Sequence, residues 1–285
     1  MPELPDLIYM QERLAPLVAG RTIANLEVTN PIVLRVAVPQ GAEQALAGAR
    51  IDTVERHGPF LAVHTDRCEL VFHFMLTGRL QHTRAKGRKI AHQAFCIDLD
   101  DGSLLRYGDQ KQMGRVYILP PGDYSAVPGY TTQGVDITGE QFDVATFRKL
   151  ARGVRSQTRV FLMDQRKLSA LGNAYADEVL FAARIHPKTR TNTIDEEGLD
   201  RLHAAIRSVI ADSVEYIRAR AEPIEKKIRD HVKVRNKKGQ PCPRCGTTIR
   251  REQVHGYDTF FCPQCQPAPD GLFIDWNARP DRPQA

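Results

Sequence analysis

The chain has 285 residues, enough for two domains, and 42% of them are hydrophobic, so a sizeable core can form. Its formal net charge of +6 and its sequence pI of about 9.0 favour polyanionic partners. No run approaches the ~18 apolar residues of a membrane helix, and no basic segment followed by an apolar one marks a signal peptide. The composition therefore predicts a cytoplasmic protein without a membrane partner, and we expect it to act as a monomer.

The first residues carry a possible nucleophile. Removal of Met1, which a small second residue favours, leaves Pro2 as a free secondary amine. An α-amino group has a pKa of about 7.7–8.0, so part of it is neutral near pH 7, and its attack on a carbonyl-like carbon gives an iminium ion that draws electrons. Glu3 and Asp6 follow within one helical turn and can move protons there. Taken alone, the hexapeptide favours an ordinary extended start in which Pro2 and Pro5 have no chemical role.

Helical spacing of apolar residues at 3–18, followed by Gly20, predicts one N-terminal helix. Turn signals then separate short strand-like runs up to about residue 120. The expected strands are Thr22–Val28, Arg50–Glu55, Phe60–His64, Glu69–Leu76, Ala94–Leu99 and Ser103–Tyr107. This pattern predicts an antiparallel β-sandwich behind the helix. The basic run at 84–89 is either a solvated hairpin tip or a phosphate contact.

A segment with three prolines and three glycines, residues 120–135, reads as a linker, and the spacing after it is helical. The expected helices are Phe142–Arg152, Thr158–Gln165, Tyr175–Ala183 and Glu196–Arg220. Asn173 is a strong N-cap type, and helix N-termini bind phosphate. We predict an α+β protein with an N-terminal domain at 1–120, a linker at 121–138, a helical domain at 139–225, a zinc finger at 226–268 and a tail at 269–285.

Four of the six cysteines lie close together near the C-terminus, whereas Cys68 and Cys96 lie in strand-like runs as small buried residues. The clustered four form two C-x2-C knuckles separated by sixteen residues, which is the spacing of a structural tetrathiolate zinc site. They are Cys242, Cys245, Cys262 and Cys265. The alternative of two disulfides is disfavoured in an intracellular compartment. We expect Thr247–Ile249 and Thr259–Phe261 to pair as a hairpin between the knuckles.

The charge around this cluster suggests a nucleic-acid contact. Residues 218–252 contain twelve Lys or Arg and four acidic residues. The alternative is a zinc ribbon that contacts protein, and the charge favours nucleic acid.

Three motifs in this order resemble the formamidopyrimidine-DNA glycosylase and endonuclease VIII family of base-excision repair enzymes. They are Pro2–Asp6, the Gly-Asn-x-Tyr-Ala-x-Glu pattern at Gly172–Glu178, and the four-cysteine finger at Cys242–Cys265. The resemblance covers residues 2–266. It implies a β-sandwich domain and a helix-two-turn-helix domain that carries the finger, with double-stranded DNA containing damaged bases or abasic sites as the partner and one structural zinc ion as the cofactor.

The resemblance also implies a mechanism. The damaged nucleotide is flipped from the stack, the Pro2 nitrogen attacks the sugar C1′, and the base leaves. Glu3 protonates the ring oxygen, and β-elimination, with or without δ-elimination, then cuts the strand. Asn173 and Tyr175 belong to the motif that holds the phosphate backbone, which positions DNA without reading its sequence.

Several positions depart from the family pattern. The second glutamate is Asp6, and Pro59 stands where a loop lysine usually grips DNA. The residues that fill the gap left by a flipped base correspond to Leu76, Gln112 and Met113, the last two beside Lys111 in Asp109–Gly114. An apolar wedge is kept, but the arginine that meets the opposite base is not.

The largest departure lies in the finger hairpin. Tyr257 stands where the family usually has an arginine, and Asp258 follows it. A bidentate charged contact with phosphate is therefore lost. Asp258 would repel phosphate unless Arg250 or Arg251 neutralises it. The segment 229–240 is short, so the long loop that covers oxidised guanine in some relatives is missing.

These changes spare Pro2 and Glu3. We therefore expect a bifunctional DNA glycosylase and abasic-site lyase with an altered lesion range. The alternative is a damage- or structure-binding protein with little turnover, against which the retained Pro2 and Glu3 argue. A zinc-ribbon regulator has no support outside the finger.

Overall fold

The computed structural model describes residues 2–84 and 87–269. The chain divides into two compact units. Unit 1 contains the chain up to Gln141, Gln165–Gly172 and Ile210–His231, and unit 2 contains Phe142–Asp164, Asn173–Val209 and the chain from Val232. The five-part division expected from the sequence stays a prediction, and most of its tail lies outside the described residues. Within the described ranges, no helix combines the length and the apolarity that a bilayer crossing requires.

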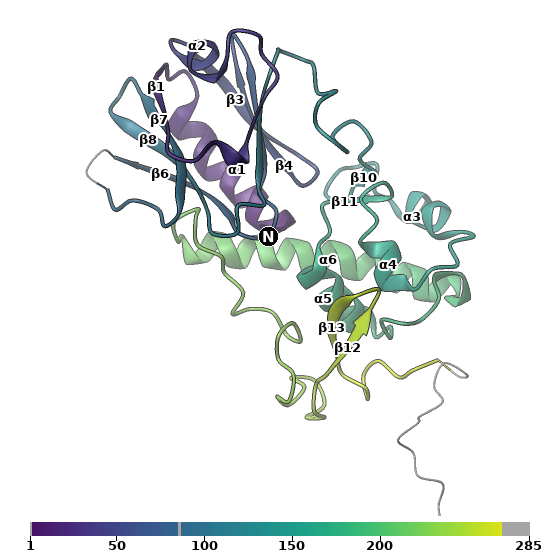
Figure 1. The fold of residues 1–285 in the computed structure, drawn as a ribbon. Helices are drawn as coiled ribbons and strands as arrows, with labels where there is room; N and C mark the ends of the chain where they lie inside the picture. The colour runs from purple at the N-terminus through teal and green to yellow at the C-terminus, as the bar shows by residue number, and fades with distance from the viewer. Residues whose placement is uncertain (1, 85–86, 270–285) are drawn as a thin grey trace, which may run out of the picture. The chain divides into compact units, whose positions relative to one another are not determined.

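Unit 1 is a sandwich of two sheets with a helix beside them (Figure 1). The strand order is β1-β7-β8-β6 in the four-stranded sheet and β2-β9-β5-β4-β3 in the five-stranded sheet. The first sheet is β1 Ile23–Val28, β7 Gln93–Leu99, β8 Ser103–Asp109 and β6 Gly78–Arg84. The second sheet is β2 Leu34–Val36, β9 Arg115–Leu119, β5 Glu69–His73, β4 Phe60–Thr65 and β3 Ile51–His57. All neighbours are antiparallel except β2 and β9.

One core joins the inner faces of both sheets to helix α1 (Leu4–Val18). Alternate strand residues such as Phe72, Phe95 and Leu105 are at most 2% exposed, because strand side chains point to opposite faces in turn. The helix adds Leu7 and Leu14 at helical spacing. The expected leading helix and β-sandwich are confirmed. Strands β2 and β6 were missed because one is short and the other carries charged residues; β9 was missed although its Val-Tyr-Ile run is typical of a strand.

Small elements complete unit 1. Helix α2 (Ala42–Leu46) and the turn η1 (Pro31–Val33) lie between strands β1 and β3 in the sequence. Strands β10 (Val135–Asp136) and β11 (Leu168–Ser169) pair in parallel. They approach closely at Gly134, where a Cβ atom would lie 2.3 Å from the Lys167 carbonyl carbon, so glycine is needed there.

Helix α6 (Glu196–Arg220) is one continuous helix that contributes to both units. Its C-terminal part belongs to unit 1, where Ile217 packs with Tyr9 and Ile228. The Tyr9 hydroxyl donates to the Glu222 carbonyl at 2.7 Å. These contacts fix the start of the segment that follows α6 against helix α1.

Unit 2 contains α3 (Val144–Ala151), α4 (Thr158–Leu162), α5 (Asn173–Ala183), the turn η2 (Thr191–Thr193) and the N-terminal part of α6. The four helices expected here are confirmed within a few residues at their ends. Helices α4 and α5 are connected by turn residues and the short strand β11, where the helix-two-turn-helix was expected. Helix α5 begins at Asn173 itself, so Gly172 takes the N-cap position that the sequence suggested for Asn173.

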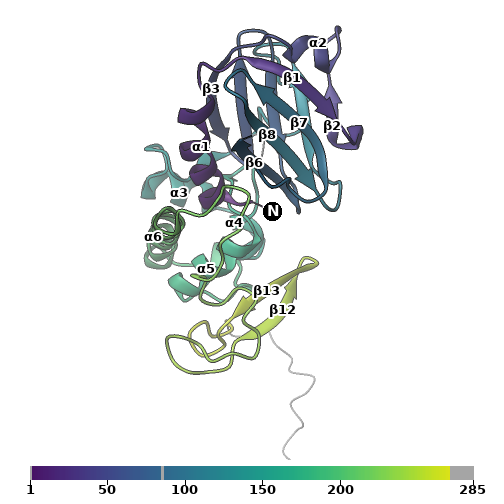
Figure 2. The same ribbon diagram turned by 90° about the vertical axis from the view of Figure 1, so that its left-hand side faces the viewer.

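The finger hairpin consists of β12 (Arg250–Val254) and β13 (Tyr257–Phe261), seen side by side in Figure 2. The expected pairing of Thr247–Ile249 with Thr259–Phe261 is wrong for its first strand. Arg250 pairs with Phe261, while Thr248 bridges to Pro241 and Ile249 is buried. The buried Ile249 joins Phe260 and Phe181 in a small core, so the apolar segment was needed for packing next to the first knuckle.

Candidate active site and nucleic-acid interface

The start of helix α1 is a buried acidic corner. Pro2 is buried, and Glu3 and Asp6 are 6% and 7% exposed. Glu3 has extended backbone angles at the N-cap, and its N–H donates to Asp6 Oδ2 at 2.7 Å. This is one half of a capping box, which satisfies a backbone donor that the helix leaves without a partner. Three predicted catalytic residues are thus brought together by the local geometry of one helix end.

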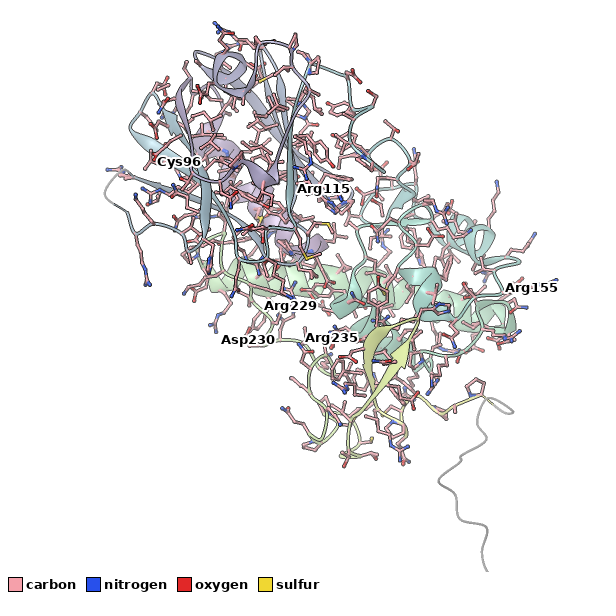
Figure 3. All side chains as sticks on the ribbon, viewed as in Figure 1. Cys96, Arg115, Arg155, Arg229, Asp230 and Arg235 are labelled. Carbon is pink, nitrogen blue, oxygen red and sulfur yellow. The ribbon has the colours of Figure 1, made fainter. Side chains whose placement is uncertain are left out.

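Asp6 is held from the other side by Arg229, which lies on the segment after α6 (Figure 3). The Arg229 guanidinium donates to Asp6 Oδ1 at 2.8 Å and makes a second, shorter contact with Oδ2. The side chains are 16% and 8% exposed. A bidentate pair of this kind fixes orientation as well as charge. The shorter Asp6 side chain therefore still reaches two partners, the Glu3 amide and Arg229.

Two further cations surround this corner. The pKa of Lys227 is lowered, first by desolvation of its ammonium and then by Arg229, although part of its side chain is exposed; Glu3 and Asp6 oppose the shift. The pKa of Arg79 is also lowered by burial, with Asp6 opposing. The acidic corner is therefore enclosed by positive charge within unit 1, an arrangement suited to an anionic ligand.

Gly172 explains part of the Gly-Asn motif. A Cβ atom on Gly172 would lie 2.5 Å from Glu3 Cδ and 2.6 Å from Glu3 Oε2. Real Cβ atoms do not approach other atoms so closely. The glycine therefore leaves the space that the Glu3 carboxyl group occupies, which links the second sequence motif to the first.

The expected wedge residues lie on two loops of unit 1. Leu76 and Met113 are 46% and 44% exposed, so both apolar side chains are accessible at the surface of unit 1. Gln112 and Lys111 are exposed on the same loop as Met113. At the expected position of the missing loop lysine, Pro59 lies in the turn between β3 and β4.

In unit 2, the motif around Asn173 is organised by a buried arginine. Arg159 of α4 is 1% exposed; it donates to Asn173 Oδ1 at 2.8 Å and to Asp177 Oδ1 at 3.0 Å. Asn173 is half-buried, whereas Tyr175 is 1% exposed and packs inside the unit. Asn173 is therefore partly accessible to solvent, whereas the Tyr175 side chain belongs to the interior of unit 2.

Asp177 also holds the finger hairpin. It accepts hydrogen bonds from Thr259 Oγ1 at 2.7 Å and Phe260 N at 3.2 Å, and it pairs with Arg235 at 2.7 Å. Figure 3 shows Arg235 beside the hairpin. The next residue, Glu178, accepts hydrogen bonds from the backbone amides of residues 233–235. Burial raises the pKa of its carboxyl group, although these hydrogen bonds act in the opposite direction. Helix α5 thus fixes both the entry to the finger and its second strand.

The hairpin tip presents Tyr257, which is 53% exposed. The neighbouring Asp258 carboxylate lies 3.6 Å from Arg251, while Arg250 is exposed on the same strand as Arg251. The Asp258 carbonyl accepts from Arg235 at 2.8 Å and from Arg159 at 3.2 Å. Arg251 therefore offsets the charge of Asp258, and the backbone of the tip is held by the buried Arg159 and the partly buried Arg235.

The four finger cysteines fit one zinc ion. Their sulfur atoms all lie within 4.8 Å of one another, and individual separations are 3.4, 3.5 and 3.9 Å. A tetrahedral site with Zn–S bonds of about 2.3 Å needs sulfur atoms about 3.8 Å apart. Gly246 has φ +77°, as the knuckle turn requires, and backbone amides donate to Cys242 and Cys262 Sγ at 3.4 Å. Cys242, Cys245, Cys262 and Cys265 together form a closed, structural site.

The sequence analysis missed five charged residues that organise these sites. They are Arg79, Arg159, Asp177, Arg229 and Arg235. Asp6 and Arg229 are 223 positions apart, so no local spacing could have paired them. The excess of Lys and Arg in residues 218–252 was the available signal for Arg229 and Arg235, but it did not distinguish structural from exposed charges.

Comparison with known proteins gives a consistent result. Three family models match in order: the formamidopyrimidine-DNA glycosylase N-terminal domain at residues 1–116, its H2TH domain at 133–222, and a zinc finger found in FPG and IleRS at 239–268.

Whole proteins agree. A formamidopyrimidine-DNA glycosylase of Symbiobacterium thermophilum is 34% identical over 99% of this chain and 95% of its own length. The Bacillus subtilis protein of that name is 30% identical over 93% and 99%. Among solved structures, a Lactococcus lactis FPG mutant bound to Fapy-dG-containing DNA is 28% identical and covers 94% of this chain and 100% of its own, with a TM-score of 0.83. The Lactococcus lactis Fpg bound to abasic-site DNA gives the same TM-score at 26% identity.

The matches cover both units and the finger, so they confirm the predicted family, fold class, zinc finger and enzyme class. The chain belongs to the formamidopyrimidine-DNA glycosylase family, a family of DNA repair enzymes that act as DNA glycosylases.

Proposed function

We propose that this protein excises damaged bases from double-stranded DNA and cuts the strand at the resulting abasic site, with the Pro2 amine as nucleophile in protein that begins at Pro2. The observation that carries the proposal is the buried corner formed by Glu3, Asp6 and Arg229 at the start of helix α1. Related proteins bound to abasic-site and Fapy-dG-containing DNA support DNA as the partner.

The residues take different roles in this mechanism. The Pro2 nitrogen attacks C1′ as the base departs, and the bond formed is the C1′–N bond of the later iminium ion. Glu3 protonates the sugar ring oxygen and then moves the proton lost from C2′ during elimination. Asp6 is a positioning residue, because its carboxylate is occupied by the Glu3 amide and Arg229.

The remaining predicted contacts serve DNA binding. Asn173 approaches a phosphate, and Leu76, Gln112 and Met113 fill the space left by the flipped nucleotide, with Lys111 beside them. Tyr175 is 1% exposed, so its part in the motif is packing inside unit 2 rather than contact with DNA. On the finger, Tyr257 donates one neutral hydrogen bond, while Arg250 supplies charge.

We further propose an altered lesion range. Proline replaces the family's loop lysine at Pro59, and Gln112 and Tyr257 replace two arginines of the family pattern. None of these changes falls on Pro2, Glu3, Asp6 or Arg229 themselves. The expected result is preserved covalent chemistry with weaker or different selection of the base and of its opposite partner.

Borohydride trapping on a duplex with one abasic site tests the proposal. The protein is first shown by intact mass to begin at Pro2. An adduct that forms with the wild type and is lost in Pro2→Gly supports the mechanism. Binding should also weaken steeply with salt, because contacts with phosphates release counterions.

Tight binding without an adduct, in protein that begins at Pro2, would overturn catalysis and leave a damage-binding protein. A matched Pro16→Gly variant controls for loss of a proline elsewhere in helix α1. It should keep trapping even if it is less stable.

A further inference from the structure

The loops that carry Leu76 and Met113 are joined by one buried carboxylate. The Leu76 loop is residues 74–77, between β5 and β6, and the Met113 loop is residues 110–114, between β8 and β9. Asp109, at the end of β8, is 3% exposed. Its Oδ1 accepts a short hydrogen bond from the Thr77 hydroxyl, and its Oδ2 accepts from Gly114 N at 2.6 Å. One side chain therefore holds a residue from each loop.

Thr77, in the Leu76 loop, also accepts a hydrogen bond from the Met113 loop. The Lys111 amide donates to Thr77 Oγ1 at 2.9 Å and to Asp109 Oδ1 at 3.2 Å. Thr77 directly follows Leu76, and Lys111 is two residues before Met113. The hydroxyl acts as donor to the carboxylate and as acceptor from the other loop, so it uses both of its hydrogen-bonding roles.

Both loops have restrained backbones. Met75 and Gln112 have φ values of 47° and 53°, in the left-handed region that residues other than glycine seldom adopt. Each is the immediate neighbour of an exposed apolar residue, Leu76 or Met113. Such conformations persist only where surrounding contacts hold them, and Asp109 and Thr77 provide such contacts.

The Tyr107 side chain packs closely against the backbone at Gly78, which follows the Leu76 loop, and at Gly114 of the Met113 loop. Its hydroxyl lies 2.4 Å and 1.9 Å from the positions that Cβ atoms on Gly78 and Gly114 would take. Tyr107 is fully buried, and within the described ranges its hydroxyl has no hydrogen-bond partner. The ring therefore restricts both loops by packing, while Asp109 and Thr77 provide the directional bonds.

We propose that Asp109 and Thr77 form a latch that holds the Leu76 loop and the Met113 loop as one body, so that both apolar side chains enter a duplex together. The latch rests on the proposed function, because that function assigns wedging of DNA to Leu76 and Met113. A preorganised pair avoids the separate ordering of two loops at the moment of insertion. Asp109 and Thr77 are positioning residues, since they act through the side chains that touch DNA.

Stopped-flow fluorescence of 2-aminopurine placed opposite a tetrahydrofuran abasic analogue measures insertion without any chemical step. Thr77→Val should slow the fluorescence change about tenfold, and Thr77→Ser should restore it, because serine keeps the hydroxyl. Asp109→Asn should slow it as well. The control is Thr83→Val on strand β6, which removes a hydroxyl that donates to the neighbouring Arg84 carbonyl.

A double-mutant cycle isolates the coupling itself. If the loops move as one body, Leu76→Ala and Met113→Ala should be strongly non-additive in the wild type and nearly additive in a Thr77→Val background. Equal coupling in both backgrounds would overturn the latch, as would a Thr77→Val rate within about twofold of wild type. A wild type that gives no fluorescence change would overturn it too. Borohydride trapping of the same protein reports separately on the Pro2 chemistry.

Discussion

The start of helix α1 in unit 1 and the tip of the finger hairpin in unit 2 differ in how tightly their side chains are held. At the helix start, Glu3 and Asp6 are almost fully buried, and Asp6 is fixed by the Glu3 amide and Arg229. At the hairpin tip, the backbone is anchored by arginines, but Tyr257 is more than half exposed. At the helix start the departure from the family pattern is conservative, a carboxylate for a carboxylate at Asp6, whereas at the exposed tip Tyr257 replaces a charged residue. A substitution at the tip can thus alter DNA contacts without repacking, whereas one at the helix start cannot.

The largest effect should come from closing the space behind Glu3. Gly172→Ala places a Cβ atom 2.5 Å from Glu3 Cδ, so the carboxyl group must move. A displacement of about 1 Å in a catalytic group can cost about 100-fold in rate, which is the loss expected for base excision. Single-turnover excision on damaged duplexes measures it.

Trapping at a preformed abasic site should fall less for Gly172→Ala, because the base has already left. Gly139→Ala is the matched control, since its Cβ atom would meet its nearest neighbour only at 3.4 Å. Unchanged excision in Gly172→Ala would show that the position of Glu3 does not matter.

The next effect concerns the pairing of Asp6 with Arg229. Asp6→Asn leaves the Arg229 charge poorly paired in a mostly buried site. Breaking a buried pair costs about 3–5 kcal/mol, and partial exposure reduces the expected cost here to about 2 kcal/mol. Hydrogen exchange of the α1 amides measures this local stability, and excision should fall about tenfold as Glu3 loosens.

An exposed pair in the same unit provides the comparison. Arg50 and Asp52 are 3.1 Å apart with side chains 59% and 43% exposed, so Asp52→Asn should change stability much less than Asp6→Asn does. If both substitutions had equally small effects, the helix start would not be the more constrained region.

A smaller effect is expected at the hairpin tip. Tyr257→Arg adds a charged donor at a 53% exposed position and leaves the bonds of Arg159 and Arg235 to the Asp258 carbonyl in place. One added phosphate contact should tighten DNA binding several-fold at low salt and steepen the salt dependence by about one unit in log–log slope. Tyr257→Phe is the control and should leave the slope unchanged. A slope that Tyr257→Arg does not alter would mean that the tip does not reach phosphate.

The same contrast explains what the sequence could reveal. Helix α1, most sandwich strands and the cysteine knuckles follow from local spacing, since periodicity and short motifs encode them. The environment of Asp6 does not, because its partner Arg229 lies 223 residues away. Nor could the sequence show that Gly172 makes room for Glu3, or that Tyr175 is buried while Asn173 is not. The sequence identified candidate residues by their chemical type, but it could not assign their roles, because those roles depend on contacts between segments that are far apart in the chain.

The smallest effect tests how firmly the finger hairpin is packed within unit 2. His186 is 3% exposed, its ring lies 4.7 Å from that of Phe261, and burial lowers its pKa to about 4. Because the folded pKa lies below the unfolded value of about 6.5, the folded state favours the neutral ring. This contribution is complete above pH 6.5 and is lost as the pH falls towards 4. Between pH 8 and pH 6 the loss should be about 0.8 kcal/mol.

Protection factors of the β13 amides, measured at pH 8 and pH 6, test this. His186→Phe keeps an aromatic ring against Phe261 but cannot be protonated, so its protection should change less than that of the wild type. Protonation of the finger cysteines affects both proteins alike and cancels in the comparison. If the two proteins lose the same protection, His186 is not the group that titrates. The hairpin would then depend on pH through its metal site, while its packing against α5, anchored by Asp177, stays constant.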